Sequence, residues 1–267
     1  MKYSLINIIY NLPLSNYLTG FIKKKLLKNN KIAFVPTKKS LLPTRNYPVQ
    51  NSIGHQEEII KSFEKNNKLS FNTFPNLRYL LRERFTPDAS FNFLDVGGDK
   101  LDFYLSISKE FKNINYYLIN LPEVNQIISQ LKKKYTYNNL RILDNLNEAK
   151  EFKYDFVYFG STLQYLENYE KFINDLLPIT KKDVFLSATW FFKNSPLKRI
   201  VVKQLNYLPL AFYLYFFNLK TILDLFKNHD FKVEFNKKNT SYSCSFKNFE
   251  DLKMNNIEYT DILFTKR

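Results

Sequence analysis

Residues 91–104, FNFLDVGGDKLDFY, contain a strand pattern, two glycines and a helix pattern in direct succession. The first six residues are mostly apolar and strand-forming, Gly97 and Gly98 follow, and 99–109 is able to form a helix. Open α/β sheets build nucleotide sites in this way, because glycines allow a tight turn and a helix N-terminus offers free N–H groups. Paired glycines after a strand also occur in ordinary turns, so the stretch leaves both interpretations open.

The downstream sequence repeats the alternation of short apolar runs and amphipathic runs. Strands are expected at 91–96, 115–120, 140–143, 155–159, 183–189, 231–236 and 259–265, and helices at about 99–111, 123–135, 168–177 and 218–229. This alternation predicts a doubly wound α/β sheet of seven mostly parallel strands. Polar residues rather than a helix separate the last two strands, which are therefore expected to form an antiparallel hairpin at the edge.

Two regions flank or interrupt this pattern. Residues 1–90 are expected to form an N-terminal helical extension, with a proline-containing connector at 36–54, and residues 91–267 the α/β domain. The insertion at 191–217 follows the fifth strand, so it is expected to cover the carboxyl ends of the strands as a lid. Its many aromatic residues fit a buried core or a homodimer contact equally well.

Composition limits the classes of function. The chain has 267 residues and a formal charge of +15, which favours anionic partners such as a nucleotide-activated substrate, nucleic acid or a membrane surface. The abundance of Lys, Asn, Ile, Phe and Tyr also fits an AT-rich coding sequence. Cys244 is the only cysteine, and His55 and His229 lie far apart, so neither a disulfide nor a His/Cys zinc site is expected.

No export signal or membrane span is recognised, so a cytoplasmic location is expected. The N-terminal apolar run is interrupted by polar residues, and LPLAFYLYFF at 208–217 is too short to cross a bilayer. Residues 1–28 and 208–217 are apolar enough to anchor the protein at a membrane surface, which is an alternative or additional role.

Three segments resemble a family of S-adenosylmethionine-dependent methyltransferases that belong to bacterial surface-polysaccharide (capsule or lipopolysaccharide) gene clusters. They are FLDVGGDKLDFY (93–104), YLINLPEV (117–124) and YDFVYFGSTLQYLENYEKFI (154–173). The resemblance implies a Rossmann-like class I methyltransferase fold, S-adenosylmethionine as the methyl donor, and a sugar hydroxyl as the acceptor. A nucleotide-linked sugar such as a heptose, or a glycan, is the implied acceptor.

The resemblance also implies which residues bind the donor. The glycine loop faces its amino-acid end, the second strand ends at its ribose, the third strand ends near its adenine, and the loop after the fourth strand borders donor and acceptor. The implied donor-binding residues are Asp95, Gly97, Gly98, Asn120, Leu121, Asp144, Asn145, Gly160, Ser161 and Gln164. Two of these have a structural alternative, since Asp144 fits a turn cap and Ser161 fits a helix N-cap.

The chain departs from the family pattern at two places. Asn120 stands where most such enzymes have an acidic residue for the ribose hydroxyls, and Asp99-Lys100 stand where small residues are common. These departures leave a non-catalytic interaction protein of the same fold as an alternative. The sequence GSTL at 160–163 lacks the Asn/Asp-Pro-Pro-aromatic pattern of nucleic-acid amino-methyltransferases, so no nucleic acid is expected as substrate.

Methyl transfer to a sugar hydroxyl needs an in-line approach and benefits from a general base. His55 is the first candidate because an imidazole titrates near neutral pH, although a lone His in a polar segment is often an ordinary surface residue. Asp99 and Tyr165 are the others, and Tyr165 is better suited to positioning the substrate. Four basic residues of the expected lid fit either a diphosphate contact or a solvated face: Lys193, Lys198, Arg199 and Lys203.

Overall fold

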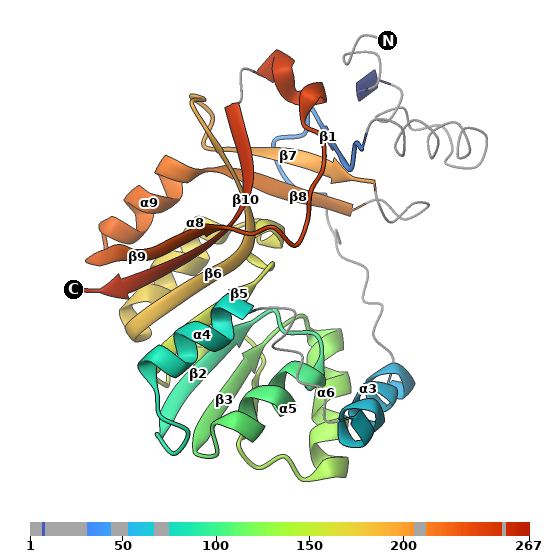
Figure 1. Cartoon of the computed structure of the whole chain (residues 1–267), viewed down its shortest axis with the longest axis vertical. Coiled ribbons are helices and arrows are strands. Elements are labelled where there is room, and N and C mark those ends of the chain that lie inside the picture. The colour runs from blue at the N-terminus through green and yellow to red at the C-terminus, as the bar shows by residue number, and fades with distance from the viewer. Residues whose placement is uncertain (1–6, 9–30, 44–52, 67–74, 206–211, 253–254) are drawn as a thin grey trace.

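The computed structural model describes residues 7–8, 31–43, 53–66, 75–205, 212–252 and 255–267 (Figure 1). Most of the helices expected over residues 1–35, and nearly all of the expected membrane anchor at 1–28, lie outside these ranges. In the part that is described, no helix is long and apolar enough to cross a membrane.

The centre of the molecule is a parallel sheet in the order β4-β3-β2-β5-β6. Its strands are β2 (Phe91–Val96), β3 (Ile114–Ile119), β4 (Leu140–Leu143), β5 (Tyr154–Gly160) and β6 (Thr180–Lys193). Beside β6 run two antiparallel strands, β10 (Asn255–Lys266) and then β9 (Phe231–Lys238) at the edge. The predicted mostly parallel α/β sheet with an antiparallel edge hairpin is confirmed.

Helices cover both faces of this sheet (Figure 1). On one face lie α4 (Pro75–Arg84), α5 (Leu101–Glu110) and α6 (Pro122–Tyr135), and on the other α7 (Leu146–Ala149), α8 (Tyr169–Leu176) and α9 (Leu219–Lys227). Along β2 the side chains alternate: Phe93 faces the first set, and Leu94 and Val96 face the second. Apolar residues on both sides of the strand bury both faces, as parallel sheets require.

The insertion expected to form a lid instead extends the sheet, so that prediction is wrong. Residues 199–204 form β7 and 212–218 form β8; β8 pairs in parallel with the end of β6, and β7 pairs antiparallel with β8. The segment's apolar and β-branched residues make it strand-forming, and all its described aromatic residues except the partly buried Tyr213 are buried, as the alternative interpretation of a core had it. Phe216 and Phe217 are buried, so 212–217 is not a membrane-surface anchor.

The N-terminal region contributes a strand as well as helices. β1 (Phe34–Pro36) pairs with β7, so that the described residues form a sheet of ten strands rather than the expected seven. The helix expected up to residue 35 is therefore wrong at 34–35, where Phe34 packs against Trp190 and Phe216 in a third core cluster. The helix α3 (Ile53–Asn66) contacts α5 and α6. A domain boundary at residue 90 stays a prediction.

Candidate functional site

The loop between β2 and α5 needs both of its glycines. Gly97 has a φ of +84°, and a Cβ there would lie 2.3 Å from Cγ2 of Thr162, in the loop that follows β5. A Cβ on Gly98 would lie 2.0 Å from Oδ2 of Asp95. The loop is therefore folded so tightly against its neighbours that any larger residue at either position collides with them.

Asp95, near the end of β2, is buried beneath this loop. Its side chain is 3% exposed, and the hydroxyl of Tyr116 on β3 donates a hydrogen bond of 2.6 Å to Oδ2. Burial raises the pKa of Asp95, the hydrogen bond from Tyr116 lowers it and the nearby Asp99 raises it, so that it moves from the ordinary value of 3.8 to about 7. The carboxyl group is thus poised to gain or lose a proton near neutral pH.

Asn120 joins the end of β3 to the glycine loop. Its Nδ2 donates to the carbonyl oxygen of Gly98 (2.7 Å), and its Oδ1 accepts from the backbone N–H of Leu121 (2.7 Å). The backbone N–H of Gly97 also donates to Ile119 (2.8 Å). A carboxylate at position 120 would have no proton to donate to the carbonyl oxygen of Gly98. This is a structural reason for an Asn at this position instead of an acidic residue.

Ser161 and Gln164, in the loop after β5, form a polar cluster with Tyr259 from another part of the chain. Nε2 of Gln164 donates to Oγ of Ser161 (2.9 Å), and that oxygen lies 3.3 Å from the hydroxyl of Tyr259 on β10. Ser161 has a φ of +58°, and its N–H donates to Ser187 of β6, so it is not a helix N-cap. Gln164 is buried, and its Oε1 has no hydrogen-bond partner among the described residues.

Of the two predicted site residues that follow β4, Asn145 caps the helix α7 and Asp144 does not. Oδ1 of Asn145 accepts from the N–H groups of Asn147 and Glu148 at the start of α7 (2.9 and 3.2 Å). Asp144 does not act as this cap; its N–H donates to the carboxylate of Glu148 (2.8 Å), and its side chain points into solvent. The exposed side chain of Asp144 therefore keeps its carboxylate for a ligand, whereas the oxygen of Asn145 already has two partners.

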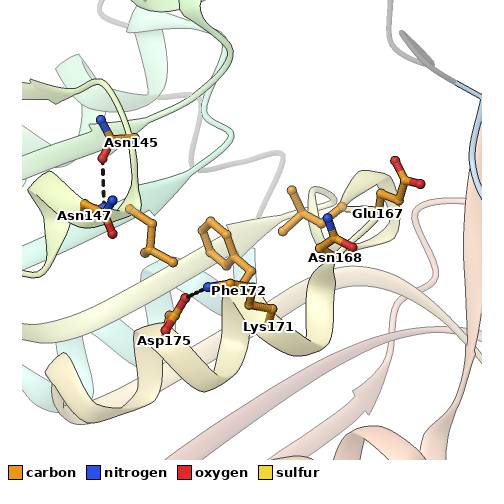
Figure 2. Close-up of a pocket in the computed structure, with 9 residues that line it drawn as sticks. Asn145, Asn147, Glu167, Asn168, Lys171, Phe172 and Asp175 are labelled. Atoms are coloured by element: carbon orange, nitrogen blue, oxygen red, sulfur yellow. Dashed lines mark hydrogen bonds and ion pairs between the residues drawn. The ribbon is translucent and has the colours of Figure 1, made fainter.

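A pocket of about 410 Å³ adjoins Asn145 (Figure 2). One wall comes from the start of α7, and the other from the connection between β5 and α8 and from α8 itself. An ion pair between Lys171 and Asp175 lies along the α8 wall. The lining residues are Asn145, Leu146, Asn147, Leu166, Glu167, Asn168, Lys171, Phe172 and Asp175. Three of these side chains are apolar, three are amides and three are charged.

The two predicted catalytic residues lie on different elements. Tyr165 is in the short helix η2 (Leu163–Tyr165) that continues the Ser161–Gln164 loop, and its hydroxyl donates to Gln204 of β7 (3.3 Å). His55 is exposed in the first turn of α3, next to Gln56, which hydrogen-bonds the residues just after Gly98. His55 is thus tied to the turn after the glycine loop through its neighbour Gln56, whereas Tyr165 lies at the end of the β5 loop.

Four side chains of this edge were not predicted from the sequence: Gln56, Tyr116, Thr162 and Tyr259. Thr162 stands inside the quoted segment 154–173, whereas the other three are tied to the site only by contacts between distant parts of the chain. Among the residues that the structure describes, no group of three or more His, Cys, Asp or Glu side chains is arranged to hold a metal ion.

Solved structures match this fold, although no protein-family model and no curated protein matches the chain. The 1,6-didemethyltoxoflavin-N1-methyltransferase of Burkholderia thailandensis, solved with 1,6-didemethyltoxoflavin and S-adenosylhomocysteine bound, has a TM-score of 0.51 at 10% identity, over 87% of this chain and 94% of its own. An S-adenosylmethionine-dependent methyltransferase from Clostridium acetobutylicum gives 0.50 at 9%, over 80% and 99%. The [4+2]-cyclase SpnF gives 0.51 at 12%, over 72% and 80%.

The protein therefore has the Rossmann-like fold of the class I methyltransferases. At these identities the similarity concerns the fold alone, and a cyclase stands among the matches. Donor, reaction and acceptor must accordingly be argued from the site.

Proposed function

We propose that this protein is an S-adenosylmethionine-dependent O-methyltransferase that acts on a sugar hydroxyl. The observation that carries the proposal is the glycine loop of Gly97 and Gly98, locked onto Asp95 and Asn120 at the carboxyl edge of a methyltransferase-type sheet. The bound S-adenosylhomocysteine of the Burkholderia thailandensis enzyme supports the choice of donor.

The residues at this edge fit the donor. The loop of Gly97 and Gly98 would hold its amino-acid end, and the exposed apolar side chain of Leu121 would cover one face of its adenine. Asp144 would meet the adenine amino group with its free carboxylate. The oxygen of buried Gln164 has no partner among the described residues. It can accept a hydrogen bond from an N–H or O–H group of the methyl donor or of the sugar.

The donor, when bound, supplies a methyl group that its sulfonium has already activated, so the protein's task is to orient the acceptor and remove its proton. We assign proton removal to His55, whose imidazole is exposed and follows Gly54 at the start of α3. Tyr165, held by Gln204, would position the acceptor. Ser161 and Tyr259 would line the part of the site between His55 and Tyr165.

The acceptor we propose is a nucleotide-linked sugar, such as a heptose, used for a capsular or other surface polysaccharide, or a glycan of that kind. The resemblance of three segments to such methyltransferases and the surplus of positive charge support this. Nucleotide-linked sugars are cytoplasmic metabolites, so the same proposal places the enzyme in the cytoplasm. Arg199 is not free to bind the diphosphate, because it lies over the ring of Tyr215 (4.2 Å) and donates to Glu167 (2.8 Å).

One observation favours a second candidate, a non-catalytic interaction protein. Both polar atoms of the Asn120 side chain are already bonded to the backbone, so the usual carboxylate for the ribose hydroxyls has no equivalent at this position. Such a protein would keep the fold and lack donor binding.

Titration calorimetry with S-adenosylhomocysteine separates these candidates. Micromolar binding that is abolished in Gly98→Arg is expected, and labelled S-adenosylmethionine would then be offered with a panel of nucleotide-sugars. Gly54→Ala is the matched control, because a Cβ on Gly54 meets no atom within 4 Å. A folded wild-type protein that binds no S-adenosylhomocysteine would instead support the interaction protein.

A further inference from the structure

Gln56, which the proposed function does not use, reaches the donor loop from a separate helix. Its side chain is fully buried, although it lies in the first turn of α3 between the exposed His55 and the half-buried Glu57. Nε2 donates to the carbonyl oxygen of Asp99 (2.6 Å), and Oε1 accepts from the backbone N–H of Leu101 (3.2 Å). One amide group therefore clamps both sides of the turn that follows Gly97 and Gly98.

The start of α5 depends on this clamp because it has no side-chain cap of its own. Lys100 occupies the N-cap position in an extended conformation, and its side chain makes no capping hydrogen bond. The N–H of Leu101, the first residue of the helix, has no partner within the helix. Gln56, 45 residues earlier in the chain, supplies that partner.

Other contacts hold α3 in place independently of Gln56. Ile60 is fully buried in the core cluster shared with α5 and α6, and Glu57 forms an ion pair of 2.5 Å with Lys134 at the end of α6. Figure 1 shows α3 beside α6 on the outer side of the sheet. Removing the Gln56 amide should therefore release the turn at 99–101 while α3 stays docked.

We infer that Gln56 is a positioning residue of the donor site, through which α3 holds the glycine loop in its binding conformation. This rests on the proposed function, since it takes S-adenosylmethionine as the ligand of that loop. Without the amide, a buried N–H and a buried C=O lose their partners, so the turn should shift toward conformations in which water satisfies them. The apparent affinity for the donor then falls by the fraction of molecules that leave the binding conformation.

The test compares S-adenosylhomocysteine affinity in variants of the full chain, with calorimetry well below the melting temperature. Gln56→Met keeps the volume and removes both hydrogen bonds, and its Kd should rise about 10-fold. Gln56→Glu turns a buried carboxylate oxygen toward the carbonyl oxygen of Asp99, so its Kd should rise at least as much as that of Gln56→Met. Glu57→Gln, the matched control on the same helix, should change Kd by less than about 2-fold, since Glu57 pairs with Lys134 rather than with the turn at 99–101 and buried Ile60 keeps α3 docked without it.

Hydrogen exchange provides a second measurement that does not depend on the ligand. The amide of Leu101 should be protected in the wild type and exchange faster in Gln56→Met, with the amides around Ile60 unchanged. A Kd for Gln56→Met equal to that of the wild type, with both proteins folded, would overturn the inference and leave the donor site intact. A wild type that binds no S-adenosylhomocysteine would refute the proposed function instead.

Discussion

The buried carboxyl group of Asp95 predicts a measurable pH dependence of stability. In the folded protein its pKa is about 7, against an ordinary value of 3.8 in the unfolded chain. Between these values the folded state binds about one proton more than the unfolded state, so this group's contribution to stability is fully present below pH 4 and is lost as the pH rises through 7. The loss is about 1.4 kcal/mol per pH unit and on the order of 4 kcal/mol in total.

Asp95→Asn removes this titration and leaves most of the geometry unchanged. The Asn side chain has the same shape, stays neutral, and its Oδ1 can still accept the hydroxyl of Tyr116. The free energy of unfolding of the variant should therefore rise relative to the wild type as the pH increases from 4 to 7, and the difference should level off above about pH 7.5.

Urea unfolding at several pH values between 4.5 and 8 measures this difference. Trp190, the single tryptophan, is buried between β-strands and reports the transition by fluorescence. Because every other titrating group is common to both proteins, its contribution cancels in the comparison. A difference that stays constant across this range would refute the reasoning, and one that changes in the opposite direction would mean that the fold favours the ionised carboxylate.

Three further substitutions test the donor loop and the proposed base. Gly98→Ala should lower the free energy of unfolding by about 1–3 kcal/mol and weaken S-adenosylhomocysteine binding, because its Cβ would overlap Asp95. Urea unfolding and calorimetry measure these two effects. Effects no larger than those of Gly54→Ala would contradict this prediction. Asn120→Asp should weaken S-adenosylhomocysteine binding several-fold because the hydrogen bond to the carbonyl oxygen of Gly98 is lost, although an acidic residue is common at this position in such enzymes. Tighter binding would contradict the structural role of the Asn120 amide. His55→Ala should reduce turnover by a factor on the order of 100 with donor affinity unchanged, and near-normal turnover would end its role as base.

Local patterns predicted the strands that need no distant partner to be recognised. The runs at 91–96, 140–143 and 154–160 are short, apolar and bounded by polar or glycine residues, and each lies within about one residue of the expected position. Burial on both faces of a parallel sheet accounts for their continuous apolar character.

The extension of β6 shows where such patterns fail. The strand was expected to end at residue 189 and continues to Lys193, with a positive φ of 54° at Ala188. The carboxylate of Asp261 accepts the N–H of Ala188 (2.7 Å) and the hydroxyl of Ser187 (3.1 Å), so the irregular backbone depends on a residue 73 positions away. No local signal reveals that contact.

The sequence by itself determined the α/β alternation, the glycine loop and the strand ends that carry Asp95, Asn120 and Ser161, because hydrophobic period and turn residues act over a few positions. That 199–204 and 212–218 add strands to the sheet is apparent only in the folded molecule. The same holds for the clamp of Gln56 on the start of α5 and the contact of Tyr259 with Ser161. The Gln56 and Tyr259 contacts join residues 45 and 98 positions apart, and the free energy that selects all of these features comes from packing and hydrogen bonds that form only when the chain has folded.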